Sequence, residues 1–335
     1  MSTQEPVIIY RYDTSPFSHK IDNVLSLKKI NYSKVDVSPT LPRPEITDYL
    51  GISYRRIPIL AIGNDIYCDT SLIISALERR FPAEKGFETV FPLPKNGGSP
   101  DTGLIRAFSK FYADDSLFPL AADLLPWARF PKAFIDDRSK LRGSAINTNA
   151  IAENVPNTQS LISSHVLLVE EQLKDSREWL FNTVRPSIAD ISVHFVFAWA
   201  RSFKGSNTIF DAKKFPFTIQ WLDRMTALIN KERQAQAVAT KLSGEDAAVK
   251  ITSYAHEPYN VVGFDVGDAS LLRFAIGDVV QVAPVDTGRS YPTTGKLVAL
   301  SQEEITLEVQ GSKGLVRCHF PRLSFFIRPA PLTKL

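Results

Sequence analysis

Three short motifs in the first part of the chain carry side chains suited to binding chemistry, and the first is Ser15-Pro16-Phe17-Ser18. It follows an apolar-rich run at residues 7–12 and precedes apolar residues at helical spacing, which predicts a strand-to-helix turn. Serine is a preferred N-cap and proline a preferred first helical residue, so Ser15 should lie beside the free N–H groups of the helix. The motif is either a plain helix cap, worth about 1 kcal/mol, or a place where a ligand meets a hydroxyl and free N–H groups.

The second motif, Arg56-Ile57-Pro58, stands at the start of an apolar run that ends at Ile62. A proline at a strand start removes one backbone donor, and it is also a position where a cis peptide bond is retained. A cis bond would turn the N–H and carbonyl of Ile57 outward, where an extended peptide can pair with them as an added strand. An ordinary trans edge proline is the other interpretation.

The third motif, Asp69-Thr70-Ser71, opens a predicted helix that ends near Arg80. Two hydroxyls and free N–H groups at a helix N-terminus form a ready carboxylate site. Helix capping alone explains the same residues, so the sequence leaves both interpretations open.

The elements that position these motifs follow from hydrophobic patterning. Residues 7–12 and 32–37 are predicted strands on either side of the first helix, which makes them a parallel βαβ unit. Residues 57–62 and 66–68 flank Gly63-Asn64-Asp65, which is typical of a tight hairpin. With the helix after Asp69, the order is β-α-β-(α)-β-β-α.

Changes in amino-acid composition and in hydrophobic patterning along the chain divide it into three domains. We predict the α/β domain at residues 6–82, a linker rich in proline and glycine at 83–102, and an all-helical domain at 103–242. The apolar helix from Ile188 is expected to be its buried centre. Residues 256–335 predict a small antiparallel β unit, which we expect to be a partly closed barrel because a lone meander exposes its edges. Four prolines are expected to interrupt the helices: Pro119, Pro126, Pro131 and Pro156.

Composition excludes several classes of protein. The 335 residues are 44% hydrophobic and 22% charged, as in folded domains. The net charge of +3 produces no strong field, so neither nucleic acid nor a membrane surface is an expected partner. Cys68 and Cys318 lack CxxC or Cys/His spacing, which argues against a disulfide scaffold and a zinc site. No signal peptide or membrane span is visible, and we expect a cytoplasmic protein without a metal.

In this order the three motifs resemble the glutathione site of the glutathione transferase superfamily. The resemblance covers roughly residues 6–235 and implies a thioredoxin-like domain followed by an all-α domain, with the β unit as an addition. A second signature is similar to the family's N-capping box, in which Ser187 caps the buried helix and Asp190 returns to the Ser187 N–H. Its residues are Trp179-Leu180-Phe181 and Arg185-Pro186-Ser187-Ile188-Ala189-Asp190.

The resemblance implies a role for each motif. Ser15 matches the residue that holds the glutathione sulfur, Ile57 and Pro58 match the cis-proline pair that holds its cysteinyl part, and Thr70 and Ser71 match the pair at its γ-glutamyl end.

One position departs from the family pattern. Members of the family commonly carry an acidic residue where Thr70 stands, and here only the adjacent Asp69 is acidic. Arg56 or Arg43 would pair with the glycine carboxylate of glutathione.

Serine at this position is chemically sufficient to activate a thiol. A free thiol with a pKa of about 8.5 is only about 3% thiolate at pH 7, and lowering that pKa by two units takes about 2.7 kcal/mol. A hydroxyl donor to a charged acceptor supplies about 1.5 to 3 kcal/mol and a helix end about 0.3 to 1. Because Ser15 and Ser18 replace a CxxC pair, we expect conjugation or thiol-assisted isomerisation instead of thiol-disulfide exchange.

The implied second substrate is a small hydrophobic electrophile of secondary metabolism or detoxification, with glutathione as co-substrate. It would bind between the first two domains. The candidate pocket residues are Tyr12, Phe17, Phe108, Phe111 and Tyr112. A homodimer is also implied.

Two other functions stay open. Thr70 in place of an acidic residue, together with the additional β domain, fits a non-catalytic scaffold or dimerisation module whose β domain recruits a partner. A glutathione-independent isomerase or cyclase would use His19 or Tyr12 for acid-base chemistry in the same cleft. His194, on the apolar helix, is interpreted as a core residue.

Overall fold

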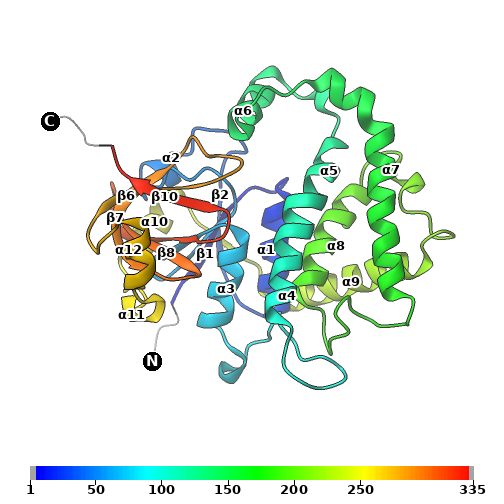
Figure 1. Cartoon of the computed structure of the whole chain (residues 1–335), viewed down its shortest axis with the longest axis horizontal. Helices are drawn as coiled ribbons and strands as arrows, with labels where there is room; N and C mark the ends of the chain where they lie inside the picture. The colour runs from blue at the N-terminus through cyan, green and yellow to red at the C-terminus, as the bar shows by residue number, and fades with distance from the viewer. Residues whose placement is uncertain (1–4, 332–335) are drawn as a thin grey trace.

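A computed structural model describes residues 5–331, and its first domain lies in the middle of the molecule (Figure 1). β1 pairs in parallel with β2 and antiparallel with β3, which pairs antiparallel with β4, so the predicted βαβ unit and hairpin are confirmed. The elements of this domain are β1 (Val7–Arg11), α1 (Pro16–Leu27), β2 (Ser33–Asp36), α2 (Pro44–Thr47), β3 (Ile59–Ile62), β4 (Asp65–Cys68) and α3 (Thr70–Arg80).

A helical domain packs against α1 and α3. Its central helix is α8, which is buried along almost its whole length, as predicted. The short turns are η1 (Ala83–Lys85), η3 (Trp127–Arg129) and η4 (Ser206–Thr208). The longer elements are α4 (Thr102–Ala107), the π-helix η2 (Phe108–Leu117), α5 (Phe118–Asp123), α6 (Lys132–Arg142), α7 (Thr148–Leu173), α8 (Ile188–Arg201) and α9 (Pro216–Ala235).

Two of the expected interruptions by proline do not occur. α7 continues through Pro156, because that residue is exposed and the buried Ile162, Val166 and Val169 after it anchor the helix. Pro119 lies in the first turn of α5, which follows η2 directly, and proline is tolerated in a first turn.

The predicted capping box is confirmed. The Ser187 N–H donates to Asp190 Oδ2 at 2.9 Å, and the Ala189 N–H donates to Ser187 Oγ at 3.2 Å. Asp190 also accepts from the Leu180 N–H at 2.8 Å and from Trp221 Nε1 at 3.1 Å. The carboxylate therefore connects α8 to the loop before it and to α9.

The C-terminal strands extend the sheet of the first domain. The strand order is β10-β6-β7-β8-β9-β4-β3-β1-β2-β5, and β9 pairs in parallel with β4. The antiparallel unit is confirmed, but pairing with β4, instead of barrel closure, covers its β9 edge. Its elements are β5 (Thr240–Lys241), α10 (Gly244–Thr252), α11 (Tyr259–Val262), α12 (Val266–Leu272), β6 (Val279–Pro284), β7 (Thr293–Leu300), β8 (Glu304–Gly311), β9 (Gly314–Pro321) and β10 (Phe325–Pro329).

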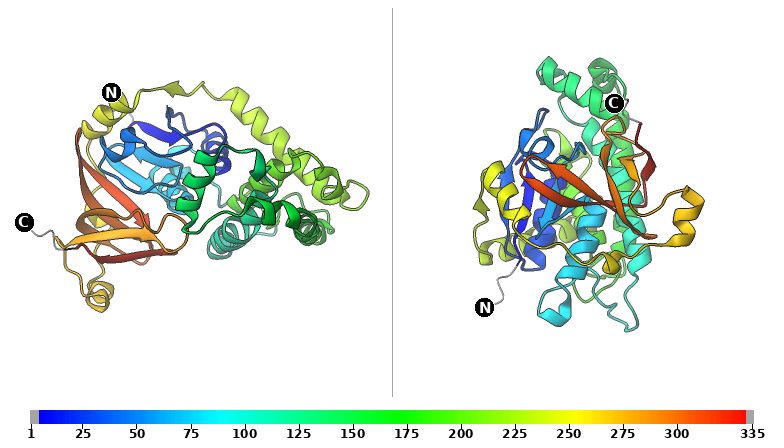
Figure 2. Two further views of the ribbon diagram at one scale, coloured as in Figure 1. Left: turned by 90° about the horizontal axis from the view of Figure 1, so that it is seen from above. Right: turned by 90° about the vertical axis from the view of Figure 1, so that its left-hand side faces the viewer.

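The chain between α9 and the C-terminal strands runs around the first domain. β5 adds to the β2 edge of the sheet, and α10 packs against α2 and β9 (Figure 2). α10 contributes Ala247, Ala248 and Ile251 to the core on this side of the sheet. The segment therefore connects the two edges of the thioredoxin-like sheet.

Alternation along the strands divides the interior into two cores. Ile9 and Leu60 belong to the core shared with α1, α3 and the helical domain, whereas Ile8 and Ile59 belong to the core shared with the C-terminal strands. Both faces of the central sheet are therefore covered, one by each of the other domains.

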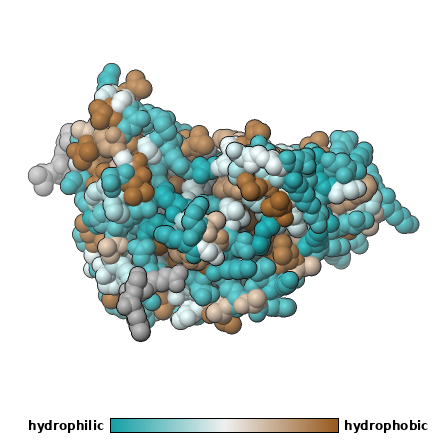
Figure 3. Space-filling model, turned by 90° about the horizontal axis from the view of Figure 1, so that it is seen from below, coloured by the Kyte–Doolittle hydropathy of each residue, from teal (hydrophilic) through white to brown (hydrophobic). Residues whose placement is uncertain are grey.

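The outer surface of the protein is mostly hydrophilic on the face shown in Figure 3, where apolar residues gather near the C-terminal β domain. Val266, Leu271 and Ile276 of that domain are exposed. None of the helices within residues 5–331 is long and apolar enough to cross a membrane.

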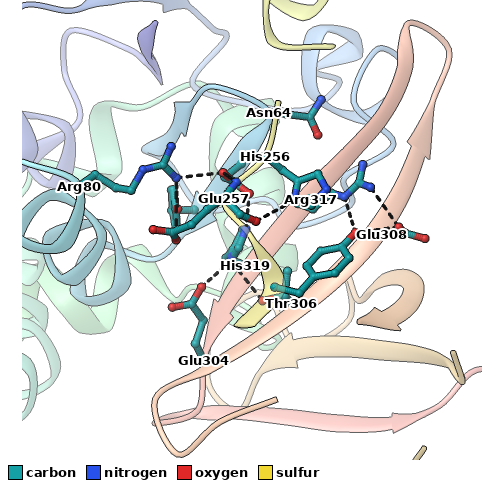
Figure 4. A network of polar contacts seen from close by, with 12 residues as sticks. Asn64, Arg80, His256, Glu257, Glu304, Thr306, Glu308, Arg317 and His319 are labelled. Atoms are coloured by element: carbon teal, nitrogen blue, oxygen red, sulfur yellow. Dashed lines mark hydrogen bonds and ion pairs between the residues drawn. The ribbon is translucent and has the colours of Figure 1, made fainter. Parts of the chain in front are cut away.

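Buried charges join β4 to the C-terminal domain (Figure 4). His319 on β9 lies between two carboxylates: its Nε2 is 3.0 Å from Asp65, and its Nδ1 bonds Glu304. Burial disfavours the charged imidazole, but Glu304 and Asp65 outweigh burial and raise the pKa of His319 to about 9. Arg80 donates to Asp65 at 2.9 Å, and Arg79 donates to Glu304 at 3.2 Å. The contact between β4 and the C-terminal domain is thus a network of buried charges that are paired with opposite charges.

We expect the two cysteines to be unreactive in the folded protein. Cys68 and Cys318 are fully buried with their sulfur atoms 3.7 Å apart, and burial followed by the Cys318 contact raises the pKa of Cys68 well above its usual value. Since the thiolate is the reactive form, a disulfide reagent at pH 8 should label neither residue in minutes and both after unfolding in urea. Rapid labelling of two thiols in the native protein would contradict this packing.

Candidate functional site

Strand pairing brings the three sequence motifs to one end of the central sheet. Ile59 of β3 pairs with Tyr10 of β1 on one side and with Cys68 of β4 on the other. The residues just beyond these strand positions include the Ser15 turn, the Ile57–Pro58 segment and the start of α3. Topology therefore places the motifs side by side, as the resemblance implies.

Ser15 is the N-cap of α1. Its Oγ accepts a hydrogen bond from the Ser18 N–H at 3.2 Å, and only 2% of the residue is exposed. Pro16 has no N–H and the Ser18 N–H is used by the cap, so within residues 5–331 the Phe17 amide is the N–H of the first turn left for a ligand. Among the hydrogen bonds of residues 5–331, Ser15 Oγ takes part only in this one, so its hydroxyl proton remains available for donation.

The Ile57–Pro58 peptide bond is cis, as one interpretation of the sequence predicted. Within the described part of the chain, neither the N–H nor the carbonyl of Ile57 has a backbone partner. These are the two groups that an extended peptide ligand would use.

Asp69 is the N-cap of α3, which begins at Thr70. Asp69 adopts φ 73°, a sterically costly conformation for a non-glycine residue, and its Oδ1 accepts from the Ser71 N–H at 3.1 Å and from Ser71 Oγ at 2.6 Å. An acidic residue therefore caps the helix N-terminus, one position before Thr70.

Three charged residues beside this helix end were missed by sequence reasoning. Lys20 of α1 is only 1% exposed, and its Nζ donates to both oxygens of Asp114 at 2.8 and 2.7 Å. Thr70 Oγ1 lies 3.5 Å from Asp114 Oδ2, and Lys110 is buried one helical turn before Asp114. Burial opposes ionisation of Asp69, but the charges of Lys110 and Arg56 outweigh it and hold its pKa below the usual range.

Only the spacing of Lys110 and Asp114, four residues apart, signals this cluster in the sequence. Both belong to η2, whose π-helical geometry changes which residues face α1 and α3. The sequence contains no indication of a π-helix, and the adjacent aromatic residues were the more conspicuous candidates.

The aromatic residues predicted to line the substrate pocket do not form one cluster in the structure. Phe17 packs against Phe118, with ring centroids 4.5 Å apart. Phe108 stacks on Tyr112 at 4.7 Å, and Tyr112 contacts His165 of α7, so these two pack within the helical domain. Phe111 is 47% exposed.

A cavity of about 220 Å³ begins at Pro16, next to Ser15, between α1, α8 and α9. Its apolar lining includes Phe195 and Trp199, and its polar lining includes His19, Asn23, His194 and Arg233. His19 Nε2 lies 2.8 Å from the Asp13 carbonyl. His194 is buried, as predicted, and burial lowers its pKa to about 4, so its imidazole is neutral.

α6 crosses above the end of the sheet where the motifs meet (Figure 1). Arg138 donates to the Tyr12 hydroxyl at 3.3 Å and to the Pro39 carbonyl at 2.9 Å. Asp137 accepts from Arg55 at 2.8 Å and from the Leu41 N–H at 3.2 Å. The site is thus closed on this side by polar contacts to α6.

Arg43 and Arg56, the two candidates for the glycine carboxylate, have other partners in this structure. Arg43 is buried and donates to three backbone carbonyls, those of Ser38, Pro39 and Arg55. Arg56 pairs with Asp286 of the C-terminal domain and lies 3.6 Å from Asp69. Arg43 is therefore a structural residue.

Comparison with known proteins agrees with this architecture. Residues 9–85 match the N-terminal domain of glutathione S-transferases, and residues 116–234 match a domain of unknown function, DUF7962. The chain is similar to a crystal structure of a glutathione transferase-like protein from Pseudomonas syringae, at 25% identity and a TM-score of 0.73, over 98% of this chain and 100% of that one.

More distant similarities concern the fold or a short segment. A rice glutathione transferase solved in complex with glutathione is 16% identical, with a TM-score of 0.50, over 75% of this chain and 96% of that one. Prostaglandin E synthase 2 of Danio rerio is 34% identical over 79 residues, which are 23% of this chain and 20% of that protein. The chain thus matches about a fifth of the length of this curated relative.

The fold and the N-terminal domain are therefore those of the glutathione transferase superfamily. A C-terminal β domain is added to them, and the Pseudomonas syringae protein shares nearly the whole length of the chain.

Proposed function

We propose that this protein is a glutathione transferase-like enzyme, in which Ser15 activates the thiol of glutathione for conjugation to a hydrophobic electrophile or for a thiol-assisted isomerisation. The observation that carries the proposal is the meeting of Ser15, Ile57 and Asp69 at one end of the sheet, in a domain that matches the glutathione S-transferase N-terminal domain.

The chemistry at Ser15 needs a hydrogen-bond donor aimed at sulfur. The Ser15 hydroxyl keeps its proton for a ligand, because its oxygen already accepts from Ser18. Donation to a thiolate, with the Phe17 amide and the positive end of α1 nearby, lowers the thiol pKa. The thiol proton leaves to solvent as the thiolate forms, and the thiolate sulfur then attacks the electrophile. The new C–S bond forms as a leaving group departs with its electron pair or, in an addition to a double bond, as the displaced electron pair takes a proton from solvent.

The remaining groups suit the peptide part of glutathione. The backbone of Ile57 would pair with the cysteinyl residue. At the γ-glutamyl end, Asp69 suits the α-ammonium group, while Lys110 and the first N–H groups of α3 suit the α-carboxylate. In this arrangement Asp69 supplies the acidic partner that is absent at Thr70.

Binding is tested by adding glutathione to the full-length protein. We expect millimolar glutathione to raise the melting temperature by several degrees and to give a saturable heat in calorimetry. Cysteinylglycine, which lacks the γ-glutamyl group, should do neither. No response to glutathione would contradict the proposal and favour the scaffold or the thiol-independent enzyme.

The substrate proposal rests on the cavity beside Pro16. Phe195 and Trp199 provide apolar walls in this cavity, which Pro16 also lines, in keeping with a small hydrophobic electrophile. Roles in detoxification or secondary metabolism, a cytoplasmic location and a homodimer remain predictions. Because β9 covers the β4 edge, a homodimer would have to use other surfaces, and sedimentation velocity measures whether one forms.

A further inference from the structure

We infer that Asp286, on the loop between β6 and β7, determines ligand specificity at this site by selecting against thiols that carry a free carboxylate at the glycyl end. The inference rests on the proposed function, since it concerns glutathione-type thiols bound along Ile57. Its structural basis is that the C-terminal domain supplies an internal carboxylate to Arg56, the arginine suited to that carboxylate.

Arg56 is held by the loop at several points. Its Nη2 pairs with Asp286, its Nε donates to the Thr287 carbonyl at 2.8 Å, and Nη2 donates to the same carbonyl at 2.6 Å. Nη1 faces Asp69 at 3.6 Å, and 17% of the side chain is exposed. Its charge is therefore shared between two carboxylates before any ligand arrives.

The neighbouring arginines do not replace it. Arg43 is occupied by three backbone carbonyls. Arg55 is buried, pairs with Asp137 at 2.8 Å and stacks on the Tyr291 ring at 4.6 Å. A glycine carboxylate would therefore have to compete with Asp286 for Arg56.

The loop is anchored, which makes this competition unfavourable. The Gly288 N–H donates to the Leu141 carbonyl of α6 at 2.7 Å, and Tyr291 N–H donates to the Gly288 carbonyl at 3.0 Å. Pairing Asp286 with Arg56 therefore costs little conformational entropy. A ligand, in contrast, must lose conformational entropy to place its carboxylate beside Arg56. The ligand would also meet the negative charges of Asp286 and Asp69. A neutral ester or amide leaves the ion pair intact.

The test compares glutathione with its glycyl ethyl ester by calorimetry on the full-length protein. The wild type should bind the ester at least as tightly as glutathione. In Asp286→Asn, glutathione should gain about five- to tenfold in affinity, while affinity for the ester changes less than twofold. Asp286→Ala should reproduce the changed ratio. Asp278→Asn removes the same charge from the other end of β6 and should leave both affinities unchanged.

The outcomes separate this inference from the proposed function. A wild type that binds glutathione several-fold more tightly than the ester, or an Asp286→Asn protein with an unaltered ratio, would overturn the specificity role and leave glutathione binding standing. If neither thiol binds to the wild type or to the variants, the proposed function fails and the inference fails with it. Because the Asp286 side chain is 49% exposed, we expect both variants to fold, with melting temperatures close to that of the wild type.

Discussion

Replacing Ser15 by alanine is expected to slow glutathione transfer by about ten- to a hundredfold, because a hydrogen bond to a charged acceptor contributes about 1.5 to 3 kcal/mol. Among residues 5–331 the hydroxyl donates to no other group, so the whole loss falls on the thiolate. The thiol pKa of bound glutathione should rise toward its value of about 8.5 in water. The ultraviolet absorbance of the thiolate, measured against pH, reports this shift directly.

Two variants separate this chemistry from helix capping. Ser15→Ala also removes the cap of α1, at a cost of about 1 kcal/mol in stability, whereas Ser15→Thr keeps both the cap and the donor and should keep most of the activity. Ser18→Ala removes a buried hydroxyl in the same turn that has no hydrogen-bond partner within the described residues, so it should leave the rate unchanged. An unchanged rate in Ser15→Ala would show that Ser15 is a cap and nothing more.

Replacing His319 by leucine is expected to lower the free energy of unfolding by about 3 to 5 kcal/mol, because it removes the cation that two buried carboxylates share and leaves Asp65 with Arg80 and Glu304 with Arg79 alone. Asp65 is fully buried, and Glu304 is 2% exposed. Urea denaturation of the wild type and the variant measures the difference. His256→Gln, beside the same network but only half-buried, is the matched control and should cost less than about 1 kcal/mol.

The same network predicts how stability depends on pH. The pKa of His319 is raised from 6.5 to about 9, so its contribution is fully present below pH 6.5 and is lost as pH rises through 9. For Asp65 and Glu304, burial opposes ionisation, but His319 together with the neighbouring Arg80 and Arg79 outweighs burial and lowers the two pKa values below 3.8 and 4.5. Their contribution is present above those values and is lost as pH falls below them. The contribution of these ion pairs to the free energy of unfolding should be largest between about pH 5 and 6.5.

The alkaline side of this profile is specific to His319. Between pH 6.5 and 9 the wild type should lose up to about 3 kcal/mol, and the curve for His319→Leu should be flatter. Parallel curves for the two proteins over this range would contradict a protonated His319 between Asp65 and Glu304.

Local signals in the sequence predicted most of the first two domains. The hairpin at Gly63, the cap at Ser15 and the capping box of Ser187 and Asp190 each depend on residues that are close together in the chain. The meeting of the three motifs also follows from the sequence, because the βαβ unit and hairpin allow only one end of the sheet for them.

Pairing between distant segments had no such signal. β4 contacts β9 through Asp65 and Arg317, which are about 250 positions apart. Neither strand contains a sequence pattern that predicts which strand it pairs with. Lys20, Lys110, Asp286 and His319 have the sequence context of ordinary surface residues. The burial of Lys20, Lys110 and His319, and the partners of all four, arise only when segments from different domains come together.

The sequence by itself determined the thioredoxin-like order of elements, the buried helix α8 and the position of Ser15, since periodicity and turn residues are local properties. Its unbroken apolar runs at residues 7–10 and Ile59–Ile62 also required cover on both faces of the sheet. Only the tertiary structure decided what provides that cover. Ten strands in one sheet place the C-terminal domain against β4, and the same contact brings Asp286 to Arg56. Long-range pairing depends on the summed fit of many residues, which no single segment encodes.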